Sequence, residues 1–151
     1  MSDMAASPLC LLAFDVGARR IGVAVGNTLS RSARAIAMVA ATDQGPDWNA
    51  VAALVREWRP DRLIVGEPLT LDGEAQLATH LARRFAREAG ERFALPVDLV
   101  DERSSSREAD RRFAESRRNG QARRRDARAL DAVAAQVILE RWFGEPGLPS
   151  P

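Results

Sequence analysis

The stretch 9–25, LCLLAFDVGARRIGVAV, decides the fold, because it joins two apolar runs through one short polar turn. The run 9–16 is nearly all apolar, and its length is typical of a buried strand. Residues 17–20 form the turn, and residues 21–25 resume with small and β-branched side chains. This pattern predicts a β-hairpin with Asp15 at the end of its first strand.

Beyond the hairpin, the chain predicts one more strand and then an alternation of helices and strands. Asp47 is a good N-cap for a helix that Pro60 stops. Ser105 and Glu108 fit the capping box of a later helix, which leads to a polar loop at 117–125. The other expected elements are strands at 33–39, 63–66 and 96–100, a helix that opens at 70–73 and reaches about residue 93, and a last helix at 127–142.

This order of elements predicts an α/β fold with a mixed five-stranded sheet flanked by helices. Three strands form an antiparallel meander, and the other two are parallel strands. We expect one domain at residues 9–143, with a disordered N-terminus at 1–8 and a disordered tail at 144–151.

The composition of the 151 residues narrows the class of protein. No apolar run reaches membrane-spanning length, and the net charge is only +1. The single cysteine, Cys10, excludes an internal disulfide, and the single histidine, His80, argues against histidine-based catalysis. We therefore expect a cytoplasmic protein without membrane contact. We also expect a monomer or a weak homodimer.

Acidic residues recur at strand ends, which is where ligands commonly bind in α/β folds. Asp15, Glu67 and the pair Asp101-Glu102 each end a predicted strand, and Asp131 interrupts a helix rich in core residues. Each also has a structural interpretation, such as a turn, a solvated strand end or a salt bridge to Arg128. Because the acids of a pair at a strand end alternate sides, only one of 101 and 102 can face the same site as Asp15.

A divalent cation would remove the repulsion among such carboxylates. Mg²⁺ prefers hard oxygen ligands and binds through a few carboxylates, waters and phosphate oxygens. Two ions about 4 Å apart would activate a water and stabilise the leaving oxygen in phosphodiester cleavage. The acids therefore indicate a nuclease that uses Mg²⁺ or Mn²⁺.

Arginines accompany the acids and fit a phosphate substrate. All basic residues are arginine, and they are concentrated at 103–128. The alternative for many of them is a solvated helix face, as the i,i+4 pair Glu108/Arg112 suggests. We expect phosphate contacts from Arg19, Arg20, Arg103, Arg123, Arg124 and Arg125.

These motifs together resemble the YqgF family of pre-16S rRNA nucleases and Holliday-junction resolvase homologues. The resemblance rests on Phe14-Asp15-Val16-Gly17 with Arg20-Ile21-Gly22, on Val65-Gly66-Glu67-Pro68-Leu69 with Asp72-Gly73, on Asp101-Glu102-Arg103 and on Asp131-Ala132-Val133-Ala134-Ala135. They occur in the family's order and cover residues 11–143.

The resemblance implies a ribonuclease H-like fold and 5′-end processing of precursor 16S rRNA, with structured RNA as substrate and ribosomal particles as partners. It implies an acidic catalytic site of Asp15, Glu102 and Asp131, which are also the metal ligands. The chain departs from the family at Glu67, where an apolar residue is usual; it is either a fourth metal ligand or a neighbour of Arg20. Thr70 and Ser104 are further departures.

Three alternatives remain open. The resemblance also implies a Holliday junction resolvase acting on branched DNA. A second is a protein of the same fold that binds nucleic acid without cleaving it. The presence of Asp15, Glu102 and Asp131 argues against this alternative. A third is a phosphotransferase, because Asp15-Val16-Gly17 resembles the phosphate loop of sugar kinases, but those enclose the nucleotide with two lobes and this chain is too short for them.

Overall fold

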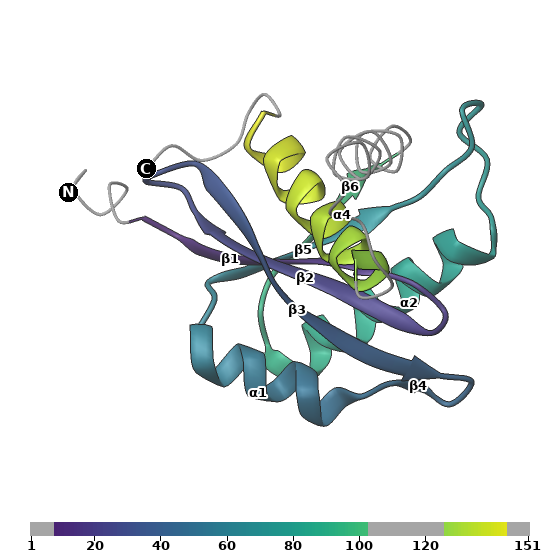
Figure 1. The fold of residues 1–151 in the computed structure, drawn as a ribbon, viewed down its shortest axis with the longest axis horizontal. Coiled ribbons are helices and arrows are strands. Elements are labelled where there is room, and N and C mark those ends of the chain that lie inside the picture. The colour runs from purple at the N-terminus through teal and green to yellow at the C-terminus, as the bar shows by residue number, and fades with distance from the viewer. Residues whose placement is uncertain (1–7, 103–125, 145–151) are drawn as a thin grey trace.

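A computed structural model describes residues 8–102 and 126–144 (Figure 1). The chain forms strands β1 (Cys10–Val16), β2 (Arg20–Asn27), β3 (Ser32–Thr42), β4 (Gly45–Pro46), β5 (Arg62–Glu67) and β6 (Val97–Asp101). The helices are α1 (Trp48–Trp58), α2 (Leu77–Phe93) and α4 (Asp126–Phe143). The helix expected at Ser105, the loop at 117–125 and nearly all of both predicted disordered ends lie outside the described residues.

The six strands form one sheet in the order β4-β3-β2-β1-β5-β6. Strands β1, β2 and β3 pair antiparallel, whereas β5 pairs parallel with both β1 and β6. The predicted meander and the two parallel strands are thus confirmed. The count of five strands was wrong by one, because the loop after β3 folds back and pairs Gly45 and Pro46 with Thr42 and Ala41.

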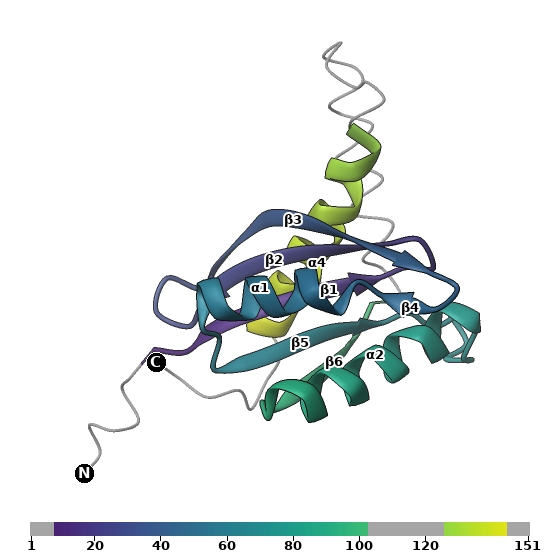
Figure 2. The same cartoon turned by 90° about the horizontal axis from the view of Figure 1, so that it is seen from below.

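Helices cover both faces of the sheet: α1 and α2 pack on one face and α4 crosses the other (Figures 1 and 2). Because side chains alternate along a strand, β1 supplies both cores. Its residues Leu12 and Phe14 belong to the core under α1 and α2, and Leu11 and Ala13 belong to the core under α4. We call these the α1/α2 face and the α4 face.

The helix expected to open at 70–73 begins only at Leu77, so this prediction was wrong. The Thr70 hydroxyl accepts the backbone N–H of Glu74 (2.9 Å), and the Thr70 carbonyl accepts that of Gly73 (2.9 Å). Gly73 has a positive φ of 88°, which ends any helical path there. Local hydrogen bonds of this kind compete with the helix and hold residues 70–74 in a turn.

The predicted first and last helices are confirmed as α1 and α4. Asp47 caps α1 by accepting the backbone N–H of Ala50 at its side chain (3.2 Å). Helix α4 is held to the sheet by Trp142, whose indole N–H donates to the Asp98 carboxylate (2.9 Å). None of the helices in the described part of the chain is long and apolar enough to span a membrane.

Candidate active site

Asp15 is the penultimate residue of β1. It lies on the α4 face and is half-buried. It faces Gly22 across the antiparallel pair with β2, and the preceding residue pairs with Val65 of β5. Gly17 begins the turn that follows, and its backbone N–H donates to the Arg20 carbonyl (3.0 Å). A Cβ at Gly17 would lie 2.8 Å from that carbonyl oxygen, so the tight turn after Asp15 requires glycine.

Glu102 follows β6 and is buried, with 5% of its surface exposed. Its backbone N–H donates to the Glu67 carbonyl oxygen (3.2 Å), which continues the β5–β6 pairing by one residue. Because Val100 belongs to the α4 core, alternation places Glu102 on the same face as Asp15 and Asp101 on the opposite face. This agrees with the expectation that only one of the two adjacent acids can share a site with Asp15.

Gly66 of β5 provides the room for the Glu102 carboxyl. A Cβ at this position would lie 2.9 Å from Glu102 Cδ and 3.0 Å from its Oε1, and it would collide with the Ile138 side chain of α4. Any side chain at Gly66 would therefore displace Glu102 or the helix. The sequence pattern did not mark this glycine as part of a site.

Burial, and next the negative charge of Asp15, raise the pKa of the Glu102 carboxyl from an ordinary 4.5 to about 8. The Arg141 guanidinium in the last turn of α4 lowers the pKa, and Asp101 raises it by a smaller amount. The two predicted ligands are thus close enough for each charge to disfavour the other. Sequence reasoning missed Arg141, although a cation on a core helix was a usable signal.

Asp131, the third predicted acid, lies in α4, but its side chain is outside the described part of the structure. Its position is four residues before Ala135 and seven before Ile138, both of which are fully buried. No three His, Cys, Asp or Glu side chains among the described residues are grouped closely enough to hold a metal. Asp15 and Glu102 therefore form the described part of the candidate site.

Glu67, the last residue of β5, is tied to α2. The Arg83 Nε donates to Glu67 Oε2 at 2.6 Å, and the Glu67 side chain is 19% exposed. Alternation along β5 places Glu67 with Leu63 and Val65, which belong to the α1/α2 core.

Two of the predicted phosphate contacts, Arg19 and Arg20, follow Asp15 in the hairpin of β1 and β2. Arg19 and Arg20 are exposed and line a groove of about 410 Å³ with residues 38–40 of β3. Arg103, Arg123, Arg124 and Arg125 are outside the described residues. The contact of these two exposed arginines with phosphate, like that of the other four, stays a prediction.

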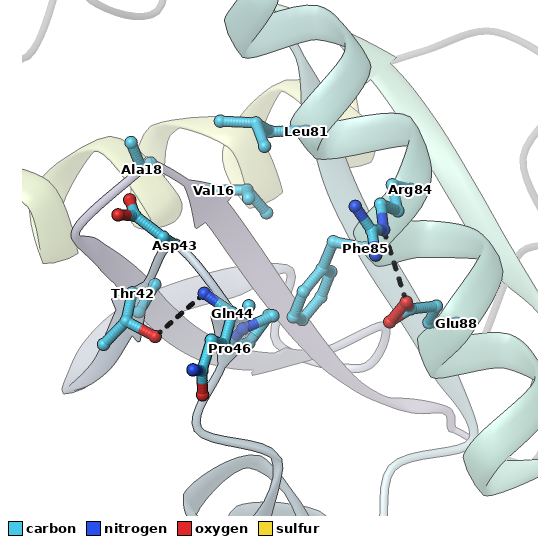
Figure 3. A pocket seen from close by; sticks show the side chains of 13 residues that line it. Val16, Ala18, Thr42, Asp43, Gln44, Pro46, Leu81, Arg84, Phe85 and Glu88 are labelled. Atoms are coloured by element: carbon cyan, nitrogen blue, oxygen red, sulfur yellow. Dashed lines mark hydrogen bonds and ion pairs between the residues drawn. The ribbon is translucent and has the colours of Figure 1, made fainter.

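A more enclosed hollow of about 90 Å³ lies on the α1/α2 face (Figure 3). Val16, Leu81 and Phe85 form its apolar wall, and Asp43 and the Arg84–Glu88 pair contribute charge. Because Val16 and Asp15 point to opposite faces of β1, this hollow is separate from the acidic site.

The donor set fits a divalent cation. Two carboxylates as close as Asp15 and Glu102 repel each other, and a cation that lies between them removes that repulsion. Carboxylate oxygens are the ligands that Mg²⁺ prefers. Such a site can bind a phosphodiester and a water together.

Comparisons with known proteins identify the family of the chain. The family model described as RuvX, Holliday junction resolvase, matches residues 9–145. Relatives from Xanthomonas oryzae pv. oryzae and Xanthomonas axonopodis pv. citri, both named "Putative pre-16S rRNA nuclease", are 58% and 57% identical over 136 residues. The matched region is 90% of this chain and 88% of each relative.

Solved structures show the same fold at low sequence identity. RuvC of T. thermophilus in complex with Holliday junction substrate is 16% identical with a TM-score of 0.54, covering 89% of this chain and 94% of that chain. The fowlpox virus Holliday junction resolvase is 15% identical with a TM-score of 0.54, covering 93% and 100%. The predicted ribonuclease H-like fold is thereby confirmed.

Proposed function

The chain belongs to the family described as RuvX Holliday junction resolvases, and on that premise we propose that it is a metal-dependent endonuclease that processes the 5′ end of precursor 16S rRNA. The observation that carries the proposal is the buried Glu102 beside Asp15 on one face of the sheet. Relatives of 57–58% identity are named "Putative pre-16S rRNA nuclease", which favours RNA as the substrate. The enzyme acts in the cytoplasm, on structured RNA within ribosomal particles, as a monomer or a weak homodimer.

The acidic residues share one role in the proposed reaction, which is to hold the metal. Asp15 and Glu102 are the first two ligands of Mg²⁺ or Mn²⁺, and Asp131 of α4 is the third. When bound, the cation supplies charge for the scissile phosphate and lowers the pKa of the attacking water. Arg19 and Arg20 hold the phosphate backbone beside the cut, and burial of Glu102 keeps bulk water away from its carboxylate.

Branched DNA is the second candidate substrate, because the family description names resolvases and the fold is shared with two of them. The likeness to those structures concerns the fold alone. A resolvase and an RNA-processing enzyme would use the same acids, so the site itself does not separate them.

The deciding experiment is a cleavage assay with a precursor 16S 5′-leader RNA and a synthetic four-way DNA junction, with Mg²⁺ or Mn²⁺. We compare the wild type with Asp15→Asn, and use Asp43→Asn as a control that removes a carboxylate on the opposite face. RNA cleavage that needs metal, is lost in Asp15→Asn and persists in Asp43→Asn would support the proposal.

Cleavage of the junction alone would move the assignment to a resolvase. If both substrates bind and neither is cut, even on ribosomal particles, the nuclease proposal fails and a non-catalytic binding protein takes its place.

A further inference from the structure

Glu67 connects two parts of the molecule through two different groups. Its backbone carbonyl accepts the N–H of Glu102 (3.2 Å), and its carboxylate accepts the Nε–H of Arg83 (2.6 Å). The first bond reaches the strand end that carries a proposed metal ligand, and the second reaches helix α2. Glu67 is therefore a physical link between α2 and Glu102.

We propose that Glu67 is a positioning residue, which with Arg83 fixes the end of β5 so that Glu102 is held at its place in the site. This inference rests on the proposed function for its consequence in catalysis. The Glu67 carboxylate has a cation partner already, and alternation along β5 directs it toward the α1/α2 face, away from the face of Asp15 and Glu102. The carboxylate thus acts through the backbone and does not bind the metal.

The position of Gly66 makes the end of β5 a sensitive place. The Glu102 carboxyl packs over Gly66, immediately before Glu67, with about 3 Å between Oε1 and the place a Cβ would occupy. A small shift of β5 therefore moves the surface on which that carboxyl lies. Arg83 holds the next residue along the strand, which limits such a shift.

The two roles of Glu67 predict opposite effects of removing Arg83. If Glu67 positions Glu102, loss of either partner weakens the same link, and loss of both does no further harm. If Glu67 is a metal ligand, Arg83 competes with the cation, and its removal strengthens metal binding.

The experiment compares Glu67→Gln, Arg83→Gln, the double variant and the exchange of the two charges, Glu67→Arg with Arg83→Glu. Arg84→Gln is the matched control, because Arg84 is also in α2 and pairs with Glu88 at 3.5 Å. The first readout, made without metal, is the hydrogen-exchange rate of the Glu102 amide. The second is Mn²⁺ affinity by calorimetry, and thermal unfolding confirms that each variant is folded.

Both single variants should speed exchange of the Glu102 amide and weaken Mn²⁺ binding on the order of 10-fold, as is common when a residue behind a ligand is lost. The double variant should match the singles, the charge exchange should restore both readouts, and Arg84→Gln should change neither. Tighter Mn²⁺ binding in Arg83→Gln, an unchanged Glu102 amide, or equal acceleration of all amides would overturn the proposal. A wild type that binds no Mn²⁺ would defeat the proposed function, and the exchange rates would still decide the role of Glu67.

Discussion

The two faces of the sheet are built from the same strands and do different work. The α1/α2 face holds the larger apolar core, in which the Phe85 ring contacts the rings of both Phe14 and Trp48. The α4 face holds a smaller core. Asp15 and Glu102 lie on this face near the ends of β1 and β6. One face supplies stability, while the other holds carboxylates in place of part of its apolar core.

This division has a physical cause. Burying a carboxyl costs free energy. The charge of Arg141 offsets this cost only in part, and Glu102 therefore stays protonated near neutral pH. The rings on the opposite face bury large apolar areas and stabilise the fold enough to tolerate that cost. Mutations on the two faces should therefore separate stability from activity.

The largest effect is expected from Phe85→Ala on the α1/α2 face. Phe85 is 2% exposed, and its ring centroid lies 4.9 Å from that of Phe14 and 5.1 Å from that of Trp48. Its truncation should lower the free energy of unfolding by about 3–5 kcal/mol. Urea denaturation measures the loss, and the variant that remains folded should bind Mn²⁺ as the wild type does. Loss of metal binding in that folded fraction would show that the faces are not independent.

A second effect should depend on pH. The folded protein binds one more proton than the unfolded chain between the ordinary pKa of 4.5 and the raised pKa of about 8, so Glu102 lowers stability as pH rises through this range. Without metal, Glu102→Gln should therefore be more stable than the wild type at pH 9, on the order of 3 kcal/mol. At pH 4 the two proteins should differ little, because Glu102 is then protonated in both states.

Urea denaturation in a chelator at several pH values gives this comparison. A difference between the two proteins that stays constant from pH 4 to pH 9 would show that Glu102 is not held in its protonated form by the fold.

The smallest change in stability is expected from Gly66→Ala. The added methyl group would press on the Glu102 carboxyl and on Ile138, which should cost about 1–3 kcal/mol. The rate of cleavage should fall about 100-fold, because a ligand displaced by about 1 Å no longer holds the reacting groups in place. Gly90→Ala is the control, since a Cβ there meets Val97 Cγ2 at 3.3 Å, away from the acids. Equal loss of activity in both variants would remove the special role of Gly66.

The candidate site was predictable in part. Strand ends marked Asp15 and Glu102, because a carboxylate after an apolar run stands out in the sequence. Gly66, Arg83 and Arg141 were not predicted, since their roles arise from contacts with residues distant along the chain. The late start of α2 was missed for a different reason: the hydrogen bonds of Thr70 outweigh the helical spacing of the following residues.

The sequence by itself determined most of the described elements, their order and the family, because hydrophobic period, caps and motifs are local properties of the chain. It also placed most of the acids at strand ends. Only the tertiary structure decided which acids share a face, since that depends on strand register and on which helix covers each side. The pairing of Glu67 with Arg83 and the elevated proton affinity of Glu102 likewise come from packing, because burial and distance exist only in the folded chain.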